Sequence, residues 1–379
     1  MMSNPRESWL VRSDGLHSRV QRFIQAATQN REEFEQLALE IAHFQAEQIP
    51  GFARLIDARH SRLDSLESVP AIPVEAFRLA RIAVHPPEVD AVRYVTSGTT
   101  SGQPGIHVMR RTDTYRSAAI TGARQALLPH GTDRALVAAL LPAGNTNTSS
   151  LAAMAQMFMD EFDPVSEASG TTSEMPARWL LTEQGIDISL VAAHLERAKS
   201  SNRPLIIAAT SFALVQFLDA LGDKRLDCWP HTIVMPTGGF KGKVSEILAP
   251  ELRTRVATAF GIDERNCVGE YGMTELSSQL YEGGLPGGTL RGEPGIYIAP
   301  AWLDVCPVDP ETLLPVPHEE LGIARFIDLA NVDSALCIVT QDMIRRKHNG
   351  IELLGRRQNA MPRGCSLSTE EWFLSNVSR

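Results

Sequence analysis

The sequence predicts an α/β fold: layered, mostly parallel sheets with helices, joined to a β-rich subdomain. Three observations support this prediction. The chain has 379 residues, 43% of them hydrophobic, which is enough for a sizeable core. Strand-like and helix-like patterns alternate between residues 135 and 270, as is typical of a parallel sheet layered with helices. From Gly292 onward, helical periodicity stops and short β-like runs follow, separated by Pro and Gly.

The N-terminal region is predicted to be helical over residues 16–48, because apolar side chains recur there every three or four positions. These positions are Val20, Phe23, Ile24, Ala27, Phe34, Leu37, Ala38 and Ile41. Polar Gln29 and Asn30 interrupt the pattern and indicate a break into two helices. Prolines punctuate residues 50–90, where the run 71–77 is predicted to be a packed connector.

The rest of the chain divides into short segments, each assigned by its periodicity and by flanking Gly and Pro. Strands are predicted at 91–95, 106–109, 135–141, 205–209, 232–235 and 267–270. Helices are predicted at 112–128, 149–162, 191–199, 211–221 and 244–259. The β-like runs of the last part lie at 295–298, 302–308, 322–329 and 335–339.

Composition argues against several classes of protein. The chain has 36 basic and 45 acidic residues, so its net charge of −9 argues against nucleic acid as a partner. Five widely spaced cysteines without a CxxC pair suggest neither a zinc site nor a disulfide framework. The N-terminus lacks the apolar core of a signal peptide, and no apolar stretch is long enough for a membrane span. We therefore expect a cytoplasmic protein.

One loop between two predicted strands is unusually rich in glycine and hydroxyl residues. It comprises Ser97, Gly98, Thr99, Thr100, Ser101 and Gly102. Such a loop exposes backbone N–H groups and hydroxyls that can cradle a phosphate. It is not a Walker loop, because no lysine is present and no helix follows directly. The same composition also suits a flexible turn, and the loop alone does not decide between the two.

Two further loops follow predicted strands, where ligands bind in open α/β sheets. The first contains Gly238, Gly239 and Phe240, and the second runs from Tyr271 to Glu275. A glycine pair lets the backbone approach a flat ligand closely. An aromatic ring, a threonine hydroxyl and a carboxylate within five residues can stack a base, bind phosphate and hold Mg²⁺. Taken singly, each loop also fits an ordinary strand-ending turn.

Together these motifs resemble the adenylate-forming superfamily, which includes acyl-CoA synthetases, nonribosomal peptide adenylation domains and firefly luciferase. The resemblance rests on the motifs Ser97–Gly102, Gly238–Phe240 and Tyr271–Glu275, in that order. Two later motifs fit as well. Thr340-Gln341-Asp342 is similar to the superfamily's Thr-Gly-Asp, with glutamine in place of glycine, and Gly355-Arg356 is similar to the Gly-Arg before its hinge.

The departures from the superfamily pattern are informative. Its members usually end the phosphate loop in Pro-Lys, whereas Gly105 follows Pro104 here, and Arg110 or Arg111 is a candidate for the missing cation. The resemblance implies an N-terminal domain over residues 1–355, with the β-rich subdomain at about 292–355. Residues 356–379 would then be a short stub in place of the usual small domain. This truncation, with Cys365 near the end, resembles the LuxE-type acyl-protein synthetases, and size and truncation also resemble EhpF-like adenylating enzymes of phenazine tailoring.

The resemblance implies a role for each matching residue. Residues 97–102 would hold the β- and γ-phosphates of ATP. Gly238, Gly239 and Phe240 would flank adenine and the acyl pocket, and Tyr271 and Gly272 would lie near adenine. Thr274 would contact the α-phosphate, Glu275 would bind Mg²⁺, Asp342 would hold the ribose, Arg356 would assist, and Cys365 would accept the acyl group.

The implied reaction is ATP-dependent adenylation of a carboxylic acid, which is then passed to a partner reductase that makes an aldehyde. Both a fatty acid and an aromatic acid such as a phenazine carboxylate remain open as substrates. Acyl-CoA formation is the alternative among enzymes, and the truncation argues against it. A non-catalytic nucleotide or acyl sensor is the alternative from another class, favoured by the absent loop lysine and by Gln341.

Overall fold

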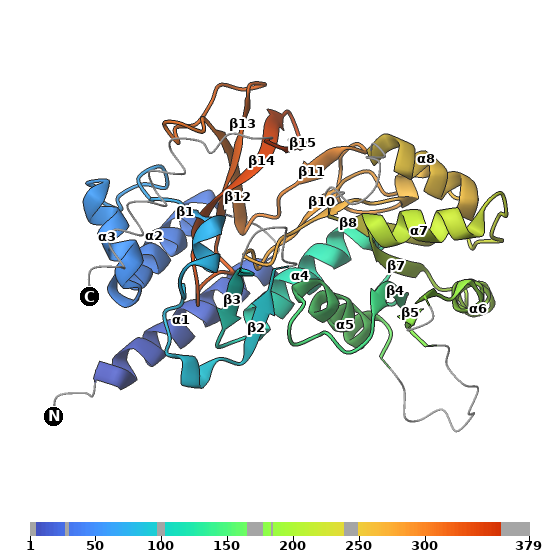
Figure 1. The fold of residues 1–379 in the computed structure, drawn as a ribbon, viewed down its shortest axis with the longest axis horizontal. Coiled ribbons are helices and arrows are strands. Elements are labelled where there is room, and N and C mark those ends of the chain that lie inside the picture. The colour runs from blue at the N-terminus through green and yellow to red at the C-terminus, as the bar shows by residue number, and fades with distance from the viewer. Residues whose placement is uncertain are drawn as a thin grey trace. The chain divides into compact units, whose positions relative to one another are not determined.

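A computed structural model gives the structure of the chain. It describes residues 5–26, 30–96, 103–164, 177–182, 185–238 and 249–357. The chain divides into two compact units, whose elements are labelled in Figure 1. The first unit contains residues 1–118, 273–279 and 299–379, and the second contains residues 119–272 and 280–298. The predicted domain boundaries remain a prediction, and each unit is described by itself below.

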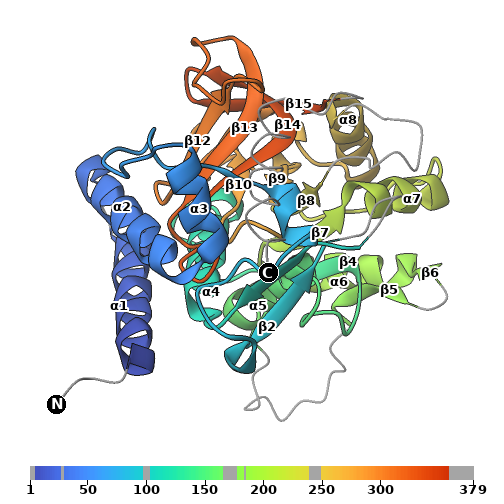
Figure 2. The same ribbon diagram turned by 60° about the vertical axis from the view of Figure 1, so that its left-hand side comes forward.

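The first unit begins with three helices: α1 (Pro5–Gln25), α2 (Arg31–Gln48) and α3 (Pro50–Ala58). The predicted break is confirmed, because the Asn30 side chain accepts a hydrogen bond from the Glu32 N–H and so begins α2. Helices α1 and α2 lie side by side (Figure 2), joined by the ion pairs Arg12–Glu47 and Arg19–Glu40. The first helix begins earlier than the predicted residue 16.

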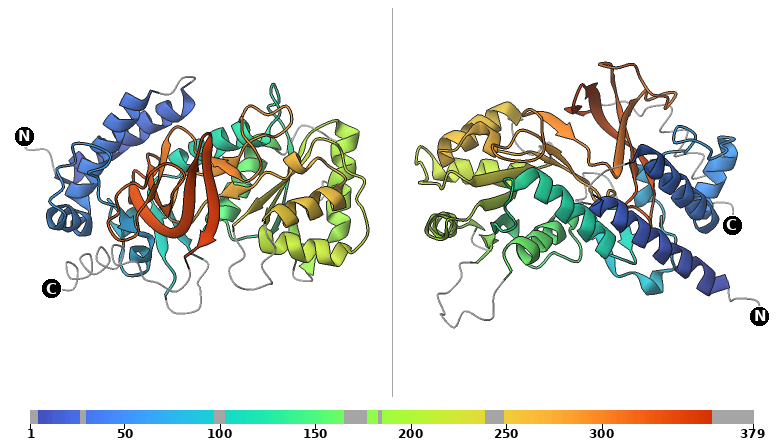
Figure 3. Two further views of the ribbon diagram at one scale, coloured as in Figure 1. Left: turned by 90° about the horizontal axis from the view of Figure 1, so that it is seen from above. Right: turned by 180° about the vertical axis from the view of Figure 1, so that it is seen from behind.

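The β structure of the first unit forms two sheets. Strands β2 (Val92–Val95) and β3 (Ile106–Met109) pair as an antiparallel hairpin. The second sheet consists of four strands that pair antiparallel in chain order: β12 (Leu303–Val308), β13 (Leu321–Asp328), β14 (Cys337–Lys347) and β15 (Gly350–Arg356). Its long strands curve strongly (Figure 3). The predicted connector pairs with it through β1 (Ile72–Pro73), parallel to β14, and continues as the 3₁₀ helix η1 (Val74–Arg78). A second 3₁₀ helix, η2, spans Pro87–Val89.

The second unit is built on a sheet in the strand order β11-β10-β9-β8-β7-β4-β5-β6. Its centre is parallel, as predicted: β4 (Leu136–Pro142), β7 (Leu205–Thr210) and β8 (Thr232–Thr237) pair in register. The remaining strands are β5 (Trp179–Thr182), β6 (Gly185–Ile186), β9 (Glu270–Tyr271), β10 (Leu280–Glu282) and β11 (Ile296–Ile298).

Helices cover the sheet of the second unit. One face packs on α6 (Ile188–Ser201), α7 (Ser211–Leu221) and α8 (Ala249–Phe260) through one apolar cluster. Residues that alternate with this cluster along β4 and β7 point to the opposite face and are also fully buried, among them Val137, Ala139 and Ile206. Helix α5 (Ser150–Phe162) lies beside β4 (Figure 1). Helix α4 (Asp113–Leu127) has residues in both units.

The strand predicted at residues 267–270 begins later than expected. The 3₁₀ helix η3 (Glu264–Asn266) ends at Cys267, whose N–H bonds to the Glu264 carbonyl. Cys267 therefore makes an isolated bridge to Val234, and regular pairing starts at Glu270. The turn that closes η3 uses the hydrogen bonds that a longer strand would need.

Candidate active site

The base of the glycine-hydroxyl loop is closed by two hydrogen bonds between Thr96 and Gly105. The Thr96 N–H donates to the Gly105 carbonyl at 2.9 Å, and the Gly105 N–H donates to the Thr96 hydroxyl at 2.9 Å. The strands on either side pair over their whole length, so the hairpin holds both ends of the loop at one place. The loop residues predicted to bind phosphate, 97–102, lie outside the described residues.

Gly105 occupies the position where the superfamily pattern has a lysine, and its neighbours approach it closely. The residue is buried, and an added Cβ would lie 3.2 Å from the Thr96 Cγ2 and 3.5 Å from the Phe77 Cβ. The same Cβ would lie 3.5 Å from the Cγ of Arg78. A side chain at this position would therefore press on the Thr96 methyl group, and Arg78 is a basic residue beside the loop base that the sequence did not single out.

Arg110 and Arg111, the candidates for the missing cation, are both engaged with carboxylates. Arg110 donates to the Asp14 carboxylate at 2.6 Å and to the Ser13 hydroxyl at 2.9 Å. Arg111 donates to Asp14 at 3.1 Å and also pairs with Asp113. Their backbone N–H groups both donate to the buried Asp333, so this corner is held by a charge network. We therefore do not propose either arginine as the cation that replaces the loop lysine.

The motif Tyr271–Glu275 is half-buried, and the residues that follow it are buried. Tyr271, Gly272, Met273, Thr274 and Glu275 are all half-buried, whereas residues 276–280 are fully buried. Buried residues fix the backbone, and half-buried residues next to them can meet a ligand. In the second unit, the Tyr271 ring makes an edge contact with Tyr297 at 6.5 Å between centroids.

Two buried side chains hold the backbone of Thr274 and Glu275 inside the first unit. His107 Nδ1 lies 2.7 Å from the Thr274 carbonyl, and Asn331 Nδ2 donates to the Glu275 carbonyl at 2.9 Å. Burial lowers the pKa of His107 to about 4, so the ring is neutral at physiological pH. Because the carbonyl can accept but not donate, Nδ1 carries the proton.

The same polar network continues beneath the motif. Asn331 also donates to the Ala335 carbonyl at 2.9 Å and accepts from the Ser277 hydroxyl. The carboxylate of Asp328 accepts from the Ser277 N–H at 2.9 Å and from the Ser278 hydroxyl at 2.6 Å, and burial raises the pKa of Asp328 to about 6. Sequence reasoning missed His107 and Asn331. The available signal was polar residues inside the apolar run 326–339 and a histidine directly after the loop.

The remaining predicted residues lie at strand ends. Gly238 follows β8 with a φ of 73° that favours glycine, and its carbonyl accepts from the Ser211 hydroxyl at 2.7 Å. Asp342 on β14 accepts from Arg356 Nε on β15 at 2.8 Å, so the structure brings this predicted pair together. Gly239, Phe240 and Cys365 lie outside the described residues.

The chemistry of Glu275 fits a magnesium ligand, because Mg²⁺ in nucleotide sites takes one or two carboxylates and completes its shell with phosphates and water. Its backbone is held by Asn331 while its side chain is half-buried. Among the described residues, no group of three or more His, Cys, Asp or Glu side chains is placed to hold a metal. A resident all-protein metal cage is therefore not seen in that part of the chain.

The four described cysteines are poor candidates for an acyl acceptor. Burial raises the pKa of the Cys228 and Cys267 thiols to about 12, and it also raises the pKa of Cys306 and Cys337. A raised pKa lowers the fraction of reactive thiolate.

Glu270, beside the motif in the second unit, gives a prediction on pH dependence. Its buried carboxyl receives a hydrogen bond from the Thr237 hydroxyl, and burial raises its pKa from 4.5 to about 7. A raised carboxyl pKa contributes stability below pH 4.5 that is lost as pH rises through 7. Glu270→Gln should therefore become increasingly stable relative to the wild type over this interval, by about 3 kcal/mol or less.

Urea unfolding of both proteins across this pH range measures the difference in their free energies of unfolding. Glu311→Gln, which changes an exposed carboxylate, is the matched control. A difference that stays constant with pH for Glu270→Gln would show that the carboxyl is ionised throughout.

Two curated proteins have sequences similar to part of this chain. The chain is 22% identical over 210 residues to a long-chain-fatty-acid–luciferin-component ligase of Vibrio harveyi, covering 52% of this chain and 53% of the relative. It is 21% identical over 215 residues to the protein of the same name from Aliivibrio fischeri, covering 53% and 54%. The matched region thus spans about half the length of these curated relatives. No family model matches the chain.

Solved structures of ligases share the fold of this chain. An open conformation of 2-hydroxyisobutyryl-CoA ligase, in complex with 2-HIB-AMP and CoA, matches with a TM-score of 0.59 at 14% identity. The match covers 88% of this chain and 77% of that protein. This likeness shows that the chain shares the fold of this adenylate-forming ligase. The fold class predicted from the sequence is therefore confirmed, and the predicted resemblance to adenylate-forming ligases agrees with these relatives, whereas the finer resemblance to EhpF-like enzymes stays a prediction. Within the residues described, no helix combines the length and apolar character needed to cross a bilayer.

Proposed function

We propose that this chain uses ATP to adenylate a carboxylic acid. The observation that carries the proposal is the hydrogen bond from His107 to the Thr274 carbonyl. His107 is the second residue of β3, which leaves the glycine-hydroxyl loop, so this bond fixes the Thr-Glu motif to the strand that supports the loop. A shared rigid support is what a site needs when two loops must hold parts of one triphosphate.

The role of each predicted residue in this proposal follows the superfamily resemblance. Residues 97–102 hold the β- and γ-phosphates, and Gly238, Gly239 and Phe240 flank adenine and the acyl group. Tyr271 stacks beside adenine next to Gly272, and Thr274 contacts the α-phosphate. Asp342 binds the ribose hydroxyls, and its ion pair with Arg356 keeps the carboxylate oriented.

The proposed reaction is attack of a substrate carboxylate oxygen on the α-phosphorus of ATP. A new oxygen–phosphorus bond forms as the bond to the β-phosphate bridging oxygen breaks, and acyl-AMP and pyrophosphate result. Glu275 would hold Mg²⁺, which when bound neutralises charge on the phosphates. The chain itself places the attacking oxygen in line and supplies fixed dipoles where charge develops.

ATP–pyrophosphate exchange with a panel of carboxylic acids tests the proposal. The panel compares long-chain fatty acids with aromatic acids such as phenazine carboxylates, because the described residues do not identify the acid. Exchange with one class supports the proposal and names the substrate. Nucleotide binding without exchange for any acid supports the sensor alternative, and accumulation of acyl-CoA on addition of coenzyme A supports an acyl-CoA ligase.

We also propose that the adenylate is passed to a partner reductase that makes an aldehyde, by way of Cys365. Arg363 lies two residues before Cys365, and Ser368 with Glu371 has the form of a helix-capping box. Positive charge and a helix N-terminus would both lower the thiol pKa and favour attack on an adenylate. The dispersed cysteines without a CxxC pair support a reducing compartment, and we place this activity in the cytoplasm.

This proposal predicts a thioester on Cys365 after incubation with ATP and the acid. Intact mass spectrometry should show the acyl adduct, hydroxylamine should remove it, and Cys365→Ser should lack it. Cys228→Ser is the matched control and should keep the adduct, because burial makes that thiol unreactive. If Cys365→Ser still supports aldehyde formation with the reductase, the adenylate itself is the species passed on.

A further inference from the structure

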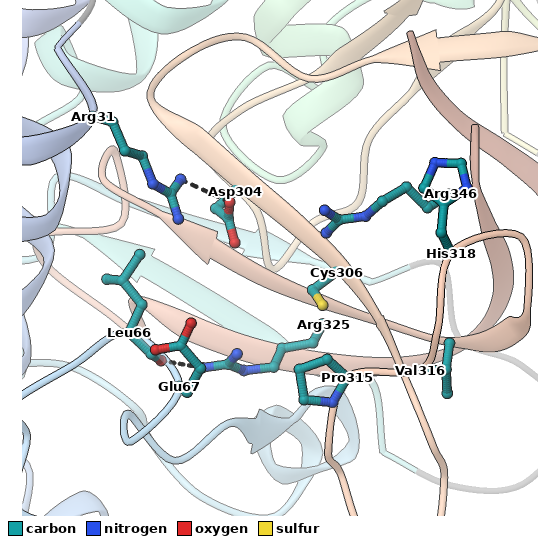
Figure 4. A pocket seen from close by; sticks show the side chains of 10 residues that line it. All are labelled: Arg31, Leu66, Glu67, Asp304, Cys306, Pro315, Val316, His318, Arg325 and Arg346. Atoms are coloured by element: carbon teal, nitrogen blue, oxygen red, sulfur yellow. Dashed lines mark hydrogen bonds and ion pairs between the residues drawn. The ribbon is translucent and has the colours of Figure 1, made fainter. Parts of the chain in front are cut away.

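A cavity of about 340 Å³ lies in the first unit, lined by residues that play no part in the proposed adenylation. Three arginines from three different elements line it: Arg31 of α2, Arg325 of β13 and Arg346 of β14. Figure 4 shows Arg31 and Arg346 reaching in from opposite sides, with Asp304 and Cys306 of β12 between them. The cavity therefore concentrates guanidinium groups at one place.

Arg325 is the most deeply buried of these arginines, with 7% of its surface exposed. Its guanidinium donates to the Leu66 carbonyl and, at 3.1 Å, to the Val69 carbonyl. Among the described residues, no carboxylate forms an ion pair with it. A buried cation is costly unless a negative charge compensates it, so the fold maintains a positive group here at a cost in stability.

The other charges do not cancel this excess. Arg346 donates to the Val305 carbonyl at 3.2 Å and, within the described part of the chain, pairs with no carboxylate. Asp304 is engaged by Arg31 at 2.9 Å. Glu67 also lines the cavity and is exposed to solvent, as Arg31 and Arg346 are, and His318 adds a further nitrogen donor. Three guanidinium groups and two carboxylates thus line the cavity; Arg31 pairs with Asp304 and, outside the cavity, with Glu35 at 3.0 Å, and Asp304 also acts on Arg325 through space.

We propose that this cavity binds the phosphate group of a small phosphorylated molecule. Guanidinium groups match phosphate oxygens in geometry and form charge-assisted hydrogen bonds with them. Donors from three elements approach from different directions, which suits a tetrahedral anion better than a planar carboxylate. The proposal is independent of the adenylation reaction, because neither the cavity nor its charges include a residue of the proposed active site.

The Cys306 thiol can report whether an anion is bound in the cavity. Its half-buried thiol lines the cavity, and burial raises its pKa while Arg346 and Arg325 oppose that rise. A bound anion would cover the thiol and slow its alkylation. The same thiol in the urea-unfolded chain is the reference, because the cavity does not exist there.

The experiment measures iodoacetamide alkylation of Cys306 by peptide mass spectrometry in the full chain, at constant ionic strength. Inorganic phosphate, phenyl phosphate and acetate are titrated separately against a chloride control. Phosphate and phenyl phosphate should slow labelling of Cys306 in the folded chain and leave its labelling in the unfolded chain unchanged. Whichever of the two protects at the lower concentration shows whether free phosphate or a phosphate ester is the better ligand.

Arg346→Gln should weaken this protection by about tenfold, the effect expected from losing one charge-assisted contact. Arg345→Gln is the matched control, because Arg345 is the preceding residue of β14 and pairs with Glu352 at 3.1 Å. Circular dichroism confirms that both variants are folded, and Arg31→Gln is a second variant should Arg346→Gln unfold. Equal protection in the two β14 variants, no protection by phosphate, or equally strong protection by acetate would each overturn the proposal.

Discussion

Glu275→Ala should lower ATP–pyrophosphate exchange by about a hundredfold or more while leaving the free energy of unfolding almost unchanged. In the proposed reaction the carboxylate holds Mg²⁺ where charge develops, and losing such a group costs on the order of 3 kcal/mol in the transition state. The fold should tolerate the change because the side chain is half-buried, and the Glu275 carbonyl keeps its hydrogen bond from Asn331. Exchange rates and urea unfolding measure the two quantities.

Two further variants test whether charge is the property that matters. Glu275→Gln keeps the size of the side chain and removes its charge, so it should lose nearly as much activity and need more Mg²⁺ for half-maximal exchange. Glu352→Ala is the matched control, since it removes a half-buried carboxylate that pairs with Arg345 and has no role in the proposed site. Wild-type exchange by Glu275→Gln would show that this carboxylate is not the metal ligand.

The central part of the fold was predictable because its signals are local. The parallel strands β4, β7 and β8 are continuous apolar runs, and the helices between them carry regular apolar periodicity. The last part was harder. Strand β14 continues through Arg345, Arg346 and Lys347, whose charged composition does not by itself indicate a strand, and these residues pair with β15 in an antiparallel hairpin. Pairing between strands, not their own composition, determines how far these strands extend.

The motifs of the candidate site were predictable from the sequence, but the residues that hold their backbone in place were not. Gly, Thr and Glu at fixed spacing are visible in the sequence because one loop supplies several contacts to a ligand. The supporting residues are distant, for His107 lies 167 positions before Thr274 and Asn331 lies 56 positions after Glu275. Periodicity and spacing describe neighbours along the chain, so contacts of this kind emerge only with the fold.

Asn331→Leu should lower the free energy of unfolding by about 3–5 kcal/mol and also reduce exchange in the protein that remains folded. The substitution removes three hydrogen bonds, one to the half-buried Glu275 carbonyl and two to buried groups, the Ala335 carbonyl and the Ser277 hydroxyl. Each unpaired buried group costs about 1–3 kcal/mol. The loss of the Glu275 contact also frees the backbone that places the proposed metal ligand, so kcat should fall more than the folded fraction does.

Asn266→Leu is the matched control for this experiment. Asn266 is also buried, in the second unit, and its amide donates to the Pro230 and Thr232 carbonyls at 3.0 Å each. It should therefore lose comparable stability, whereas its exchange rate per folded molecule should stay near that of the wild type. Circular dichroism gives the folded fraction for each variant. If both variants show the same rate per folded molecule, Asn331 serves stability alone and the backbone of Glu275 is held in place by other contacts.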